Sequence, residues 1–129
     1  MIDLASFISK YLYTPNVGDN SINTGQCTGL VEVWLDANKQ PHIYGNAKDL
    51  PANAPALGYK VVANGPTNFP APGNIVCWNS SWGGGMGHTA IVVAANANQL
   101  VVFEQNDPTG HAPTVATHDY TGIEGWITF

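Results

Sequence analysis

The sequence predicts an α+β domain in which N-terminal helices pack on an antiparallel β-sheet. The first observation is the helical spacing of apolar residues between positions 27 and 35. The second is a change of pattern after residue 58, where short runs of β-branched and aromatic residues alternate with turn residues. The third is size. A chain of 129 residues with 44% apolar content can bury one core, so we expect a single domain over residues 1–129.

Two helices and one shorter turn are expected in the first half of the chain. The first helix covers about residues 3–12, and the polar turn TPNVGDNSINTG follows it. The second helix runs from Cys27 to about Ala37 and carries one apolar stripe. That stripe contains Cys27, Leu30, Val31, Trp34 and Leu35. Proline and glycine then limit the next loop to one short helical turn at residues 46–50.

Five short runs in the second half are typical of strands: YKVVA, NIVCW, HTAIVVA, QLVVFEQN and GWITF. The turn residues between them predict an antiparallel meander. A hairpin centred near Ala97 joins the third and fourth runs. Side chains alternate across a strand, so His88 lies opposite Asn106 with Glu104 diagonal to it, and a slip of two residues places Glu104 opposite instead. Either register brings an imidazole against a carboxylate or an amide.

The charge of the chain excludes several classes of partner. Charged residues make up 10% of the sequence, the net charge is −5, and arginine does not occur. The four lysines are scattered and form no patch, which argues against nucleic acid and against anionic membranes or wall polymers. No segment approaches the roughly 20 apolar residues of a membrane span, and the N-terminus lacks the pattern of a signal peptide. We therefore expect a soluble chain that something other than a signal peptide delivers.

Cys27 allows two interpretations. It belongs to the apolar stripe of its helix, and free cysteine is among the most buried residue types. It also stands at the start of that helix, just after Gly25, where the helix dipole and free N–H groups stabilise a thiolate. Cys77 lies in the apolar run NIVCW, which favours two reduced thiols with separate roles, although a disulfide is an alternative in an oxidising compartment.

The residues expected beside His88 favour the interpretation of Cys27 as a nucleophile. A thiol nucleophile needs a base within reach and a third group that holds the base. His88 ends the loop SSWGGGMGH, whose glycines let the backbone approach a substrate closely. We expect Trp82, Gly84 and Gly85 of that loop to line a substrate groove. The alternatives are a strand-edge histidine, a solvated Glu104 and a turn-forming Asn106.

Five motifs in this order resemble the CHAP domain (cysteine, histidine-dependent amidohydrolase/peptidase): GQCTGLVEVWL, GNAKDL, PGNIVCW, GHTAIVV and VFEQN. The resemblance runs from about residue 20 to the C-terminus. It implies a papain-like (NlpC/P60-type) core and a peptidoglycan hydrolase of the kind found in phage lysins and bacterial autolysins. It also implies Cys27 as nucleophile, His88 as base and Glu104 as the group orienting the imidazole. Asn106 is then an accessory polar residue, and Gln26 shapes the oxyanion region beside the Cys27 backbone N–H.

The chain departs from the CHAP pattern at two places. Asn74 stands where the family usually has Asp in a turn, a position that looks structural. Members that bind calcium carry several acidic residues before the cysteine and an Asp two positions after it. Here Asp19 is the one acid in VGDNSINTGQCTG, and Gly29 occupies the later position. Calcium is therefore not carried over, and we expect neither a metal nor another cofactor.

Three other functions stay open at this point. A zinc amidase would need His111 and His118 to join His88, but their spacing matches no zinc motif, and these two and His42 are expected in loops. A non-enzymatic wall-binding or virion structural module would use exposed tryptophans. A transglutaminase-type acyl transferase would use the same Cys–His pair. The sequence does not distinguish amidase from endopeptidase activity.

The resemblance also implies where the domain works. Its partner is bacterial peptidoglycan, and we expect a monomer when the domain is isolated. Before release to the wall, the domain would reside in a phage virion or in the host cytoplasm, alone or as part of a larger lysin polypeptide.

Overall fold

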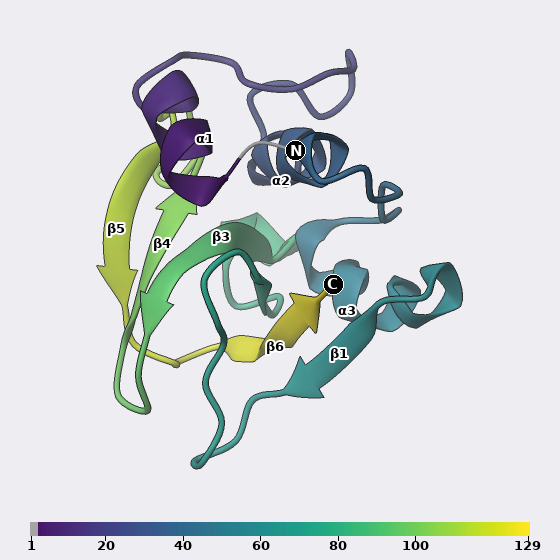
Figure 1. Cartoon of the computed structure of the whole chain (residues 1–129), viewed down its shortest axis with the longest axis vertical. Helices are drawn as coiled ribbons and strands as arrows, with labels where there is room; N and C mark the ends of the chain where they lie inside the picture. The colour runs from purple at the N-terminus through teal and green to yellow at the C-terminus, as the bar shows by residue number, and fades with distance from the viewer. Residues whose placement is uncertain (1–2) are drawn as a thin grey trace.

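Two helices lie on one face of a six-stranded antiparallel sheet in the computed structural model, which describes residues 3–129 (Figure 1). The α+β class predicted from the sequence is confirmed. The first two residues of the expected domain lie outside the described residues. Within residues 3–129, no helix is both long enough and apolar enough to cross a membrane.

The two longer helices begin close to the expected positions. Helix α1 (Leu4–Tyr11) starts after Asp3, whose carboxylate accepts a hydrogen bond from the Ser6 N–H at 2.8 Å, and it buries Phe7. Helix α2 (Cys27–Ala37) buries the predicted apolar stripe apart from its first member, Cys27, which stays partly exposed. The nucleophile candidate therefore stands at the exposed end of a buried helix face.

The segment after α2 is more helical than the single turn expected at residues 46–50. It forms three short helices: η1 (Ala47–Asp49), α3 (Leu50–Asn53) and η2 (Pro55–Leu57). A capping box between Asn46 and Asp49 starts the first of them. Pro51 and Pro55 fall in the first turn of α3 and η2, where a missing N–H removes no helical hydrogen bond. For that reason, the expectation that proline and glycine limit this loop to one short helical turn was wrong.

The strands run in the order β1-β6-β2-β3-β4-β5, and every neighbouring pair is antiparallel. Their bounds are β1 (Lys60–Ala63), β2 (Ile75–Trp78), β3 (His88–Ala95), β4 (Leu100–Glu104), β5 (Thr114–His118) and β6 (Ile123–Thr128). The predicted meander holds only from β2 to β5, because β6 returns to lie between β1 and β2. Strand β5 was not predicted. Its sequence TVATH lies at the sheet edge, has partly buried and exposed positions in alternation, and lacks a run of apolar residues.

The sheet buries apolar side chains on both faces. The face toward α1 and α2 carries Cys77, Ile91 and Phe103, while their chain neighbours on the same strands point into a second cluster around Trp78 and Trp126. Cys77 is fully buried, and burial raises the pKa of its thiol to about 12. It is a structural thiol that does not ionise near neutral pH.

The predicted hairpin register is confirmed near the candidate site. Ile91 pairs with Phe103, so the same register places Glu104, the last residue of β4, opposite Ala90 and diagonal to His88, while Asn106 lies beyond the end of β4. A bulge between Val92 and Ala94 shifts the register only closer to the turn. The start of β3 and the end of β4 therefore bring two of the candidate side chains to one end of the sheet.

Candidate active site

A cavity of about 330 Å³ lies where the start of α2 meets the start of β3. Cys27, His88 and Gln26 line it, together with residues of four loop segments. The loop residues are Ile22, Asn23, Gly45, Asn46, Ala47, Gly83, Met86, Gly87, Asn106 and Thr109, and Thr28 of α2 completes the wall. The thiol and the imidazole therefore face one solvent-accessible space that is large enough for part of a peptide.

Cys27 is the first residue of α2, and its thiol is free. The first N–H groups of a helix have no acceptor within the helix, so they are available to an anion or to a developing oxyanion. The preceding residue, Gln26, is the N-cap and has extended backbone angles. This placement puts the partial positive charge of the helix N-terminus beside Cys27.

His88 is the base candidate, and Glu104 holds it. The imidazole Nε2 lies 3.0 Å from Glu104 Oε1, and the two residues are 4% and 3% exposed. Since Nε2 faces Glu104, Nδ1 is the ring nitrogen left for Cys27. Burial lowers the pKa of His88, but its interactions with Cys27 and Glu104 outweigh burial and raise that pKa to about 9. The ring is therefore an imidazolium at neutral pH.

His118 is a second histidine on the same carboxylate. Its Nε2 lies 2.9 Å from Glu104 Oε1, so one oxygen accepts from two imidazoles. The sequence predicts His118 in a solvated loop, but it is the last residue of β5. Its backbone pairs with Leu100 at the start of β4, and its side chain reaches Glu104. We call His88, Glu104 and His118 the site cluster. No motif marked His118, because its role depends on a strand pairing that the sequence did not predict.

Two tryptophans pack on the site cluster. The Trp82 ring stacks on His88 with an interplanar angle of 16° and lies edge-on to His118. The Trp78 ring lies about 5 Å from both imidazoles, measured between ring centroids (5.0 Å to His88 and 5.1 Å to His118). These contacts restrict the orientation of both histidine rings.

The glycine loop contributes different residues to the cavity wall from those expected. Gly83, Met86 and Gly87 line the cavity, whereas Trp82, Gly84 and Gly85 do not. Trp82 turns toward the histidines instead. Gly87 has a φ of +81°, and a Cβ there would lie 2.6 Å from the Lys48 N and the Trp78 O. The loop thus needs glycine for close backbone packing just before His88, while Gly84 and Gly85 have open space around them.

Gln105 fixes the backbone that leads into Cys27, and no sequence motif marked it. It is 1% exposed, its Oε1 accepts from the Val17 N–H at 2.8 Å, and its Nε2 donates to the carbonyls of Val17 and Gln26. Two of these bonds join the end of β4 to the loop before α2, and the third joins it to the N-cap of α2. A buried amide beside Glu104 therefore sets the position of the nucleophile relative to the base.

Asn106 supports Gln26 and its own loop. Its Nδ2 donates to Gln26 Oε1 at 3.1 Å, and its Oδ1 accepts from the Gly110 N–H at 2.6 Å. Its backbone has a φ of +67°, a conformation that asparagine tolerates better than most residues. Of the two groups that the register allowed beside His88, the carboxylate of Glu104 is the hydrogen-bond partner, and the amide holds Gln26.

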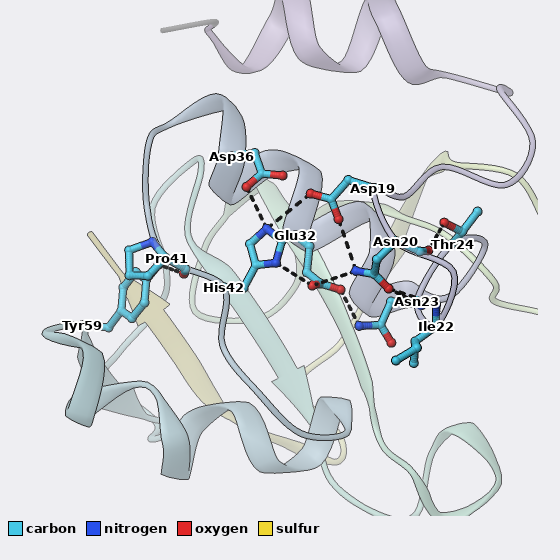
Figure 2. Close-up of polar contacts among 10 residues, drawn as sticks. All are labelled: Asp19, Asn20, Ile22, Asn23, Thr24, Glu32, Asp36, Pro41, His42 and Tyr59. Carbon is cyan, nitrogen blue, oxygen red and sulfur yellow. Dashed lines mark hydrogen bonds and ion pairs between the residues drawn. The ribbon is translucent and has the colours of Figure 1, made fainter.

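A second cluster of histidine and carboxylates lies on the outer side of α2, and Figure 2 shows its contacts. His42 Nδ1 lies 2.8 Å from Glu32 Oε2, and its Nε2 lies 2.7 Å from Asp36 Oδ1 and 3.4 Å from Asp19 Oδ2. We call Asp19, Glu32, Asp36 and His42 the loop cluster. Burial lowers the pKa of His42, but the three carboxylates outweigh it and raise that pKa. His42 is in a loop as expected, but these ion pairs anchor it.

Two sets of side chains within residues 3–129 bring possible metal-ligating atoms within 4.8 Å of one another. One is Asp19, Glu32 and His42, and the other is His88, Glu104 and Asp107. In each set a nitrogen of the histidine lies within 4.0 Å of each carboxylate of that set. His111, which the zinc alternative requires, belongs to neither set.

Gly29, the position where calcium-binding members carry an acid, has no room for a side chain. A Cβ there would lie 2.1 Å from the Asn23 carbonyl oxygen and 2.8 Å from that of Val17. The loop before Cys27 therefore packs directly on the backbone of α2. This close packing explains the glycine without reference to a metal.

Comparison with solved structures reveals the same fold in three proteins. The endolysin LysIME-EF1 superposes with a TM-score of 0.72 and 22% identity, over 99% of this chain and 64% of that one. A structure of Ly7917 with the hydrolyzing product of MDP gives 0.71 and 23%, over 95% and 59%. PlyC gives 0.71 and 22%, over 98% and 34%. The chain thus spans less than two thirds of the length of each.

The family comparison covers the segment that contains the candidate site. The CHAP domain family matches residues 17–106 of this chain. The match includes Cys27, His88, Glu104 and Asn106, and it ends before β5 and His118. More than half of the chain is covered, and the family is the one that the sequence motifs resemble. The chain therefore belongs to the CHAP domain family.

Proposed function

We propose that this CHAP domain is a peptidoglycan hydrolase that cleaves an amide or peptide bond with Cys27 as the nucleophile. The observation that carries the proposal is the arrangement of three side chains at one cavity. Cys27 begins α2, His88 faces it, and Glu104 accepts a hydrogen bond from the far nitrogen of His88. This order of nucleophile, base and orienting group is the one that covalent acyl transfer requires.

The proposed reaction has two steps. The Cys27 thiolate attacks the carbonyl carbon of the scissile bond, the C–N bond breaks, and His88 Nδ1 gives its proton to the leaving amine. Water then loses a proton to His88 as it attacks the thioester, and the C–S bond breaks to release the carboxylic acid and the thiolate. The Cys27 backbone N–H and the Gln26 side chain would stabilise the oxyanion in each step.

The ionisation of the site supports this chemistry. The His88 ring, with its pKa raised to about 9, supplies the positive charge that stabilises a neighbouring thiolate at neutral pH. Hydrogen bonds from His118 and His88 lower the pKa of Glu104 in spite of its burial, so the orienting group is a carboxylate. A charged acceptor holds an imidazolium more strongly than a neutral one.

The likeness to LysIME-EF1 and to Ly7917 with the hydrolyzing product of MDP supports a cell-wall substrate. Both the amidase and the endopeptidase reaction fit the site, because the same residues serve either bond. Mass spectrometry of fragments released from purified walls distinguishes them. A new N-terminal amine on L-alanine indicates the amidase, and cuts within the stem or cross-bridge indicate the endopeptidase.

The two cysteines provide the main test of the proposed function. Cys27→Ala should abolish wall hydrolysis while the fold is retained, because the lining of the cavity contains no second thiol. Cys77→Ser should lower stability by placing a hydroxyl among apolar side chains, but the folded fraction should keep its turnover. Equal loss of activity per folded molecule in both variants would contradict the proposal. Wall fragments joined to added amines would indicate a transferase instead.

We further propose that delivery to the wall depends on a virion or on a larger lysin polypeptide. A net charge of −5 gives no attraction to anionic wall polymers. We expect weak wall affinity for the isolated domain in a pull-down with purified walls. Tight binding that salt weakens would contradict this proposal.

A further inference from the structure

His118 stands in a position that the proposed mechanism does not use. Glu104 Oε1 accepts from His88 Nε2 at 3.0 Å and from His118 Nε2 at 2.9 Å. The three residues come from β3, β4 and β5, which are neighbours in the sheet. One carboxylate oxygen therefore joins the base candidate to a histidine outside the segment that matches the family.

The geometry fixes the protonation of both rings. An ionised carboxylate only accepts hydrogen bonds, so each Nε2 must carry a proton. The His88 ring then presents Nδ1 toward Cys27, which is the tautomer or protonated form that a thiol–imidazole pair needs. His118 supplies a second N–H donor to the same oxygen whether its ring is neutral or charged.

A second donor matters because Glu104 is deeply buried. It is 3% exposed, and a buried carboxylate is costly unless donors compensate for the water it has lost. Burial raises the pKa of Glu104, and the bond from His118, followed by that from His88, lowers it below its usual value. Without His118, one of these two compensating donors is lost.

The surroundings keep both donors in place. Trp82 stacks on His88 and meets His118 edge-on, and Trp78 contacts both rings. The other charged groups facing the cluster are Asp107, whose Oδ2 lies 4.0 Å from His88 Nε2, and Asp119, which follows His118 in the chain. Cys27 faces His88 from α2.

We propose that His118 is a positioning residue whose Nε2–H keeps Glu104 ionised and aimed at His88, and so maintains the thiolate–imidazolium pair. The inference rests on the proposed function, since it assigns a role within that site. It goes beyond the family pattern, because His118 acts from the edge strand β5 and touches neither the cavity nor Cys27.

The test compares two substitutions of one residue. His118→Gln keeps an N–H donor at similar reach, whereas His118→Leu removes it. Two readouts are followed from pH 4 to 10: wall hydrolysis, and the alkylation rate of Cys27 by iodoacetamide, which needs no wall substrate. Cys77 does not interfere, since it is buried with a raised pKa, and Cys27→Ala supplies the background. His111→Leu, at an exposed loop histidine, is the matched control.

We expect His118→Leu to lower kcat roughly tenfold to a hundredfold with little change in KM. The acidic limb of its pH profile should move to higher pH in both readouts. The reason is that Glu104 then takes up a proton more readily and no longer stabilises the His88 imidazolium. His118→Gln should keep the limb of the wild type and most of its kcat. The control His111→Leu should change neither.

Equal profiles for His118→Leu and wild type, or equal losses for Leu and Gln, would overturn the inference. If His118→Leu does not fold, ¹⁵N NMR of the wild-type imidazoles decides, because an unprotonated His118 Nε2 near neutral pH excludes the proposed bond and a protonated one supports it. Suppose that the wild type lyses no walls, while His118→Leu still shifts the pH profile of Cys27 alkylation as expected. This result would refute the proposed function and support the role of His118.

Discussion

The site cluster and the loop cluster combine the same chemical groups in opposite proportions. In the site cluster, Glu104 alone accepts from two imidazoles, those of His88 and His118. In the loop cluster, the single imidazole of His42 meets three carboxylates (Figure 2). Both raise the pKa of a histidine, yet only one of them lies at the cavity with the free thiol of Cys27.

Burial separates the two roles. The side chains of His88 and Glu104 are 5% and 3% exposed, so their bond is shielded from water and ions and keeps one geometry. The side chains of His42 and Asp36 are 31% and 48% exposed, and water and salt screen their attraction. A buried pair can direct a proton along a defined path, whereas a half-exposed one serves to tie segments together. The loop cluster joins α2 to the loops on either side of it.

Replacing the two histidines should produce the largest contrast between the clusters. We expect His88→Ala to reduce turnover by about a thousandfold or more, because it removes the group that carries protons for Cys27. His42→Ala should leave turnover per folded molecule within about twofold, since its ring contacts no site residue. Wall hydrolysis, normalised to the folded fraction by circular dichroism, measures both. If His42→Ala lowered turnover as much as His88→Ala does, the loop cluster would also be required for catalysis, and the proposed division of roles would be wrong.

Within the site cluster, Glu104→Gln should have the next largest effect. The amide keeps the shape but removes the charge that supports the His88 imidazolium, so we expect turnover to fall by about one to three orders of magnitude. Asn106→Ala should lower turnover less, because the Asn106 side chain forms hydrogen bonds with Gln26 and Gly110 and not with His88. Steady-state kinetics of both variants give the order. A severe Asn106→Ala beside a nearly silent Glu104→Gln would mean that the amide orients the base.

The pH dependence of the site should follow the His88 ring. Its pKa of about 9 predicts that wall hydrolysis falls as the pH rises through 9, when the imidazolium loses its proton. Because Cys27 contributes to raising this pKa, Cys27→Ala should lower the midpoint of the His88 titration seen by NMR. The same shift stabilises the fold. Its contribution is complete below the unfolded pKa of about 6.5 and is lost between there and 9. Titration of His88 near 6.5 in both proteins would refute the ion pair.

The sequence predicted those parts of the site that depend on local periodicity. The stripe of α2 placed Cys27 at a helix start, and strand alternation across one hairpin placed Glu104 diagonal to His88. Both follow from residues that are close in the chain or joined by a short turn. Such short-range patterns survive folding because few alternative pairings compete with them.

The parts that the sequence missed depend on contacts between distant segments. His118 reaches Glu104 only because β5 pairs with β4, and β5 is a short, half-polar edge strand. Gln105 bonds to Val17 across 88 positions of the chain. Trp82 was assigned to the cavity because its loop is rich in glycine, but packing against His88 turned it inward. Propensity contains no information about any of these contacts.

The smallest expected effect is a loss of stability on replacing His42 of the loop cluster. It tests whether the exposure of this cluster makes its ion pairs weak. His42→Gln should lower the free energy of unfolding by about 0.5 to 1 kcal/mol at pH 6 and low salt, the range of partly exposed ion pairs. The folded pKa of His42 is raised, so its contribution is complete below the unfolded pKa of about 6.5 and disappears as the pH rises through the folded value. Urea unfolding at pH 6 and pH 9, each with and without 1 M salt, measures this, with His111→Gln as the control. The loss should shrink at pH 9 and in high salt, where charges are screened within about 3 Å. A loss that is equal under all four conditions would show that His42 acts through neutral hydrogen bonds, and the difference between the clusters would then be one of position alone.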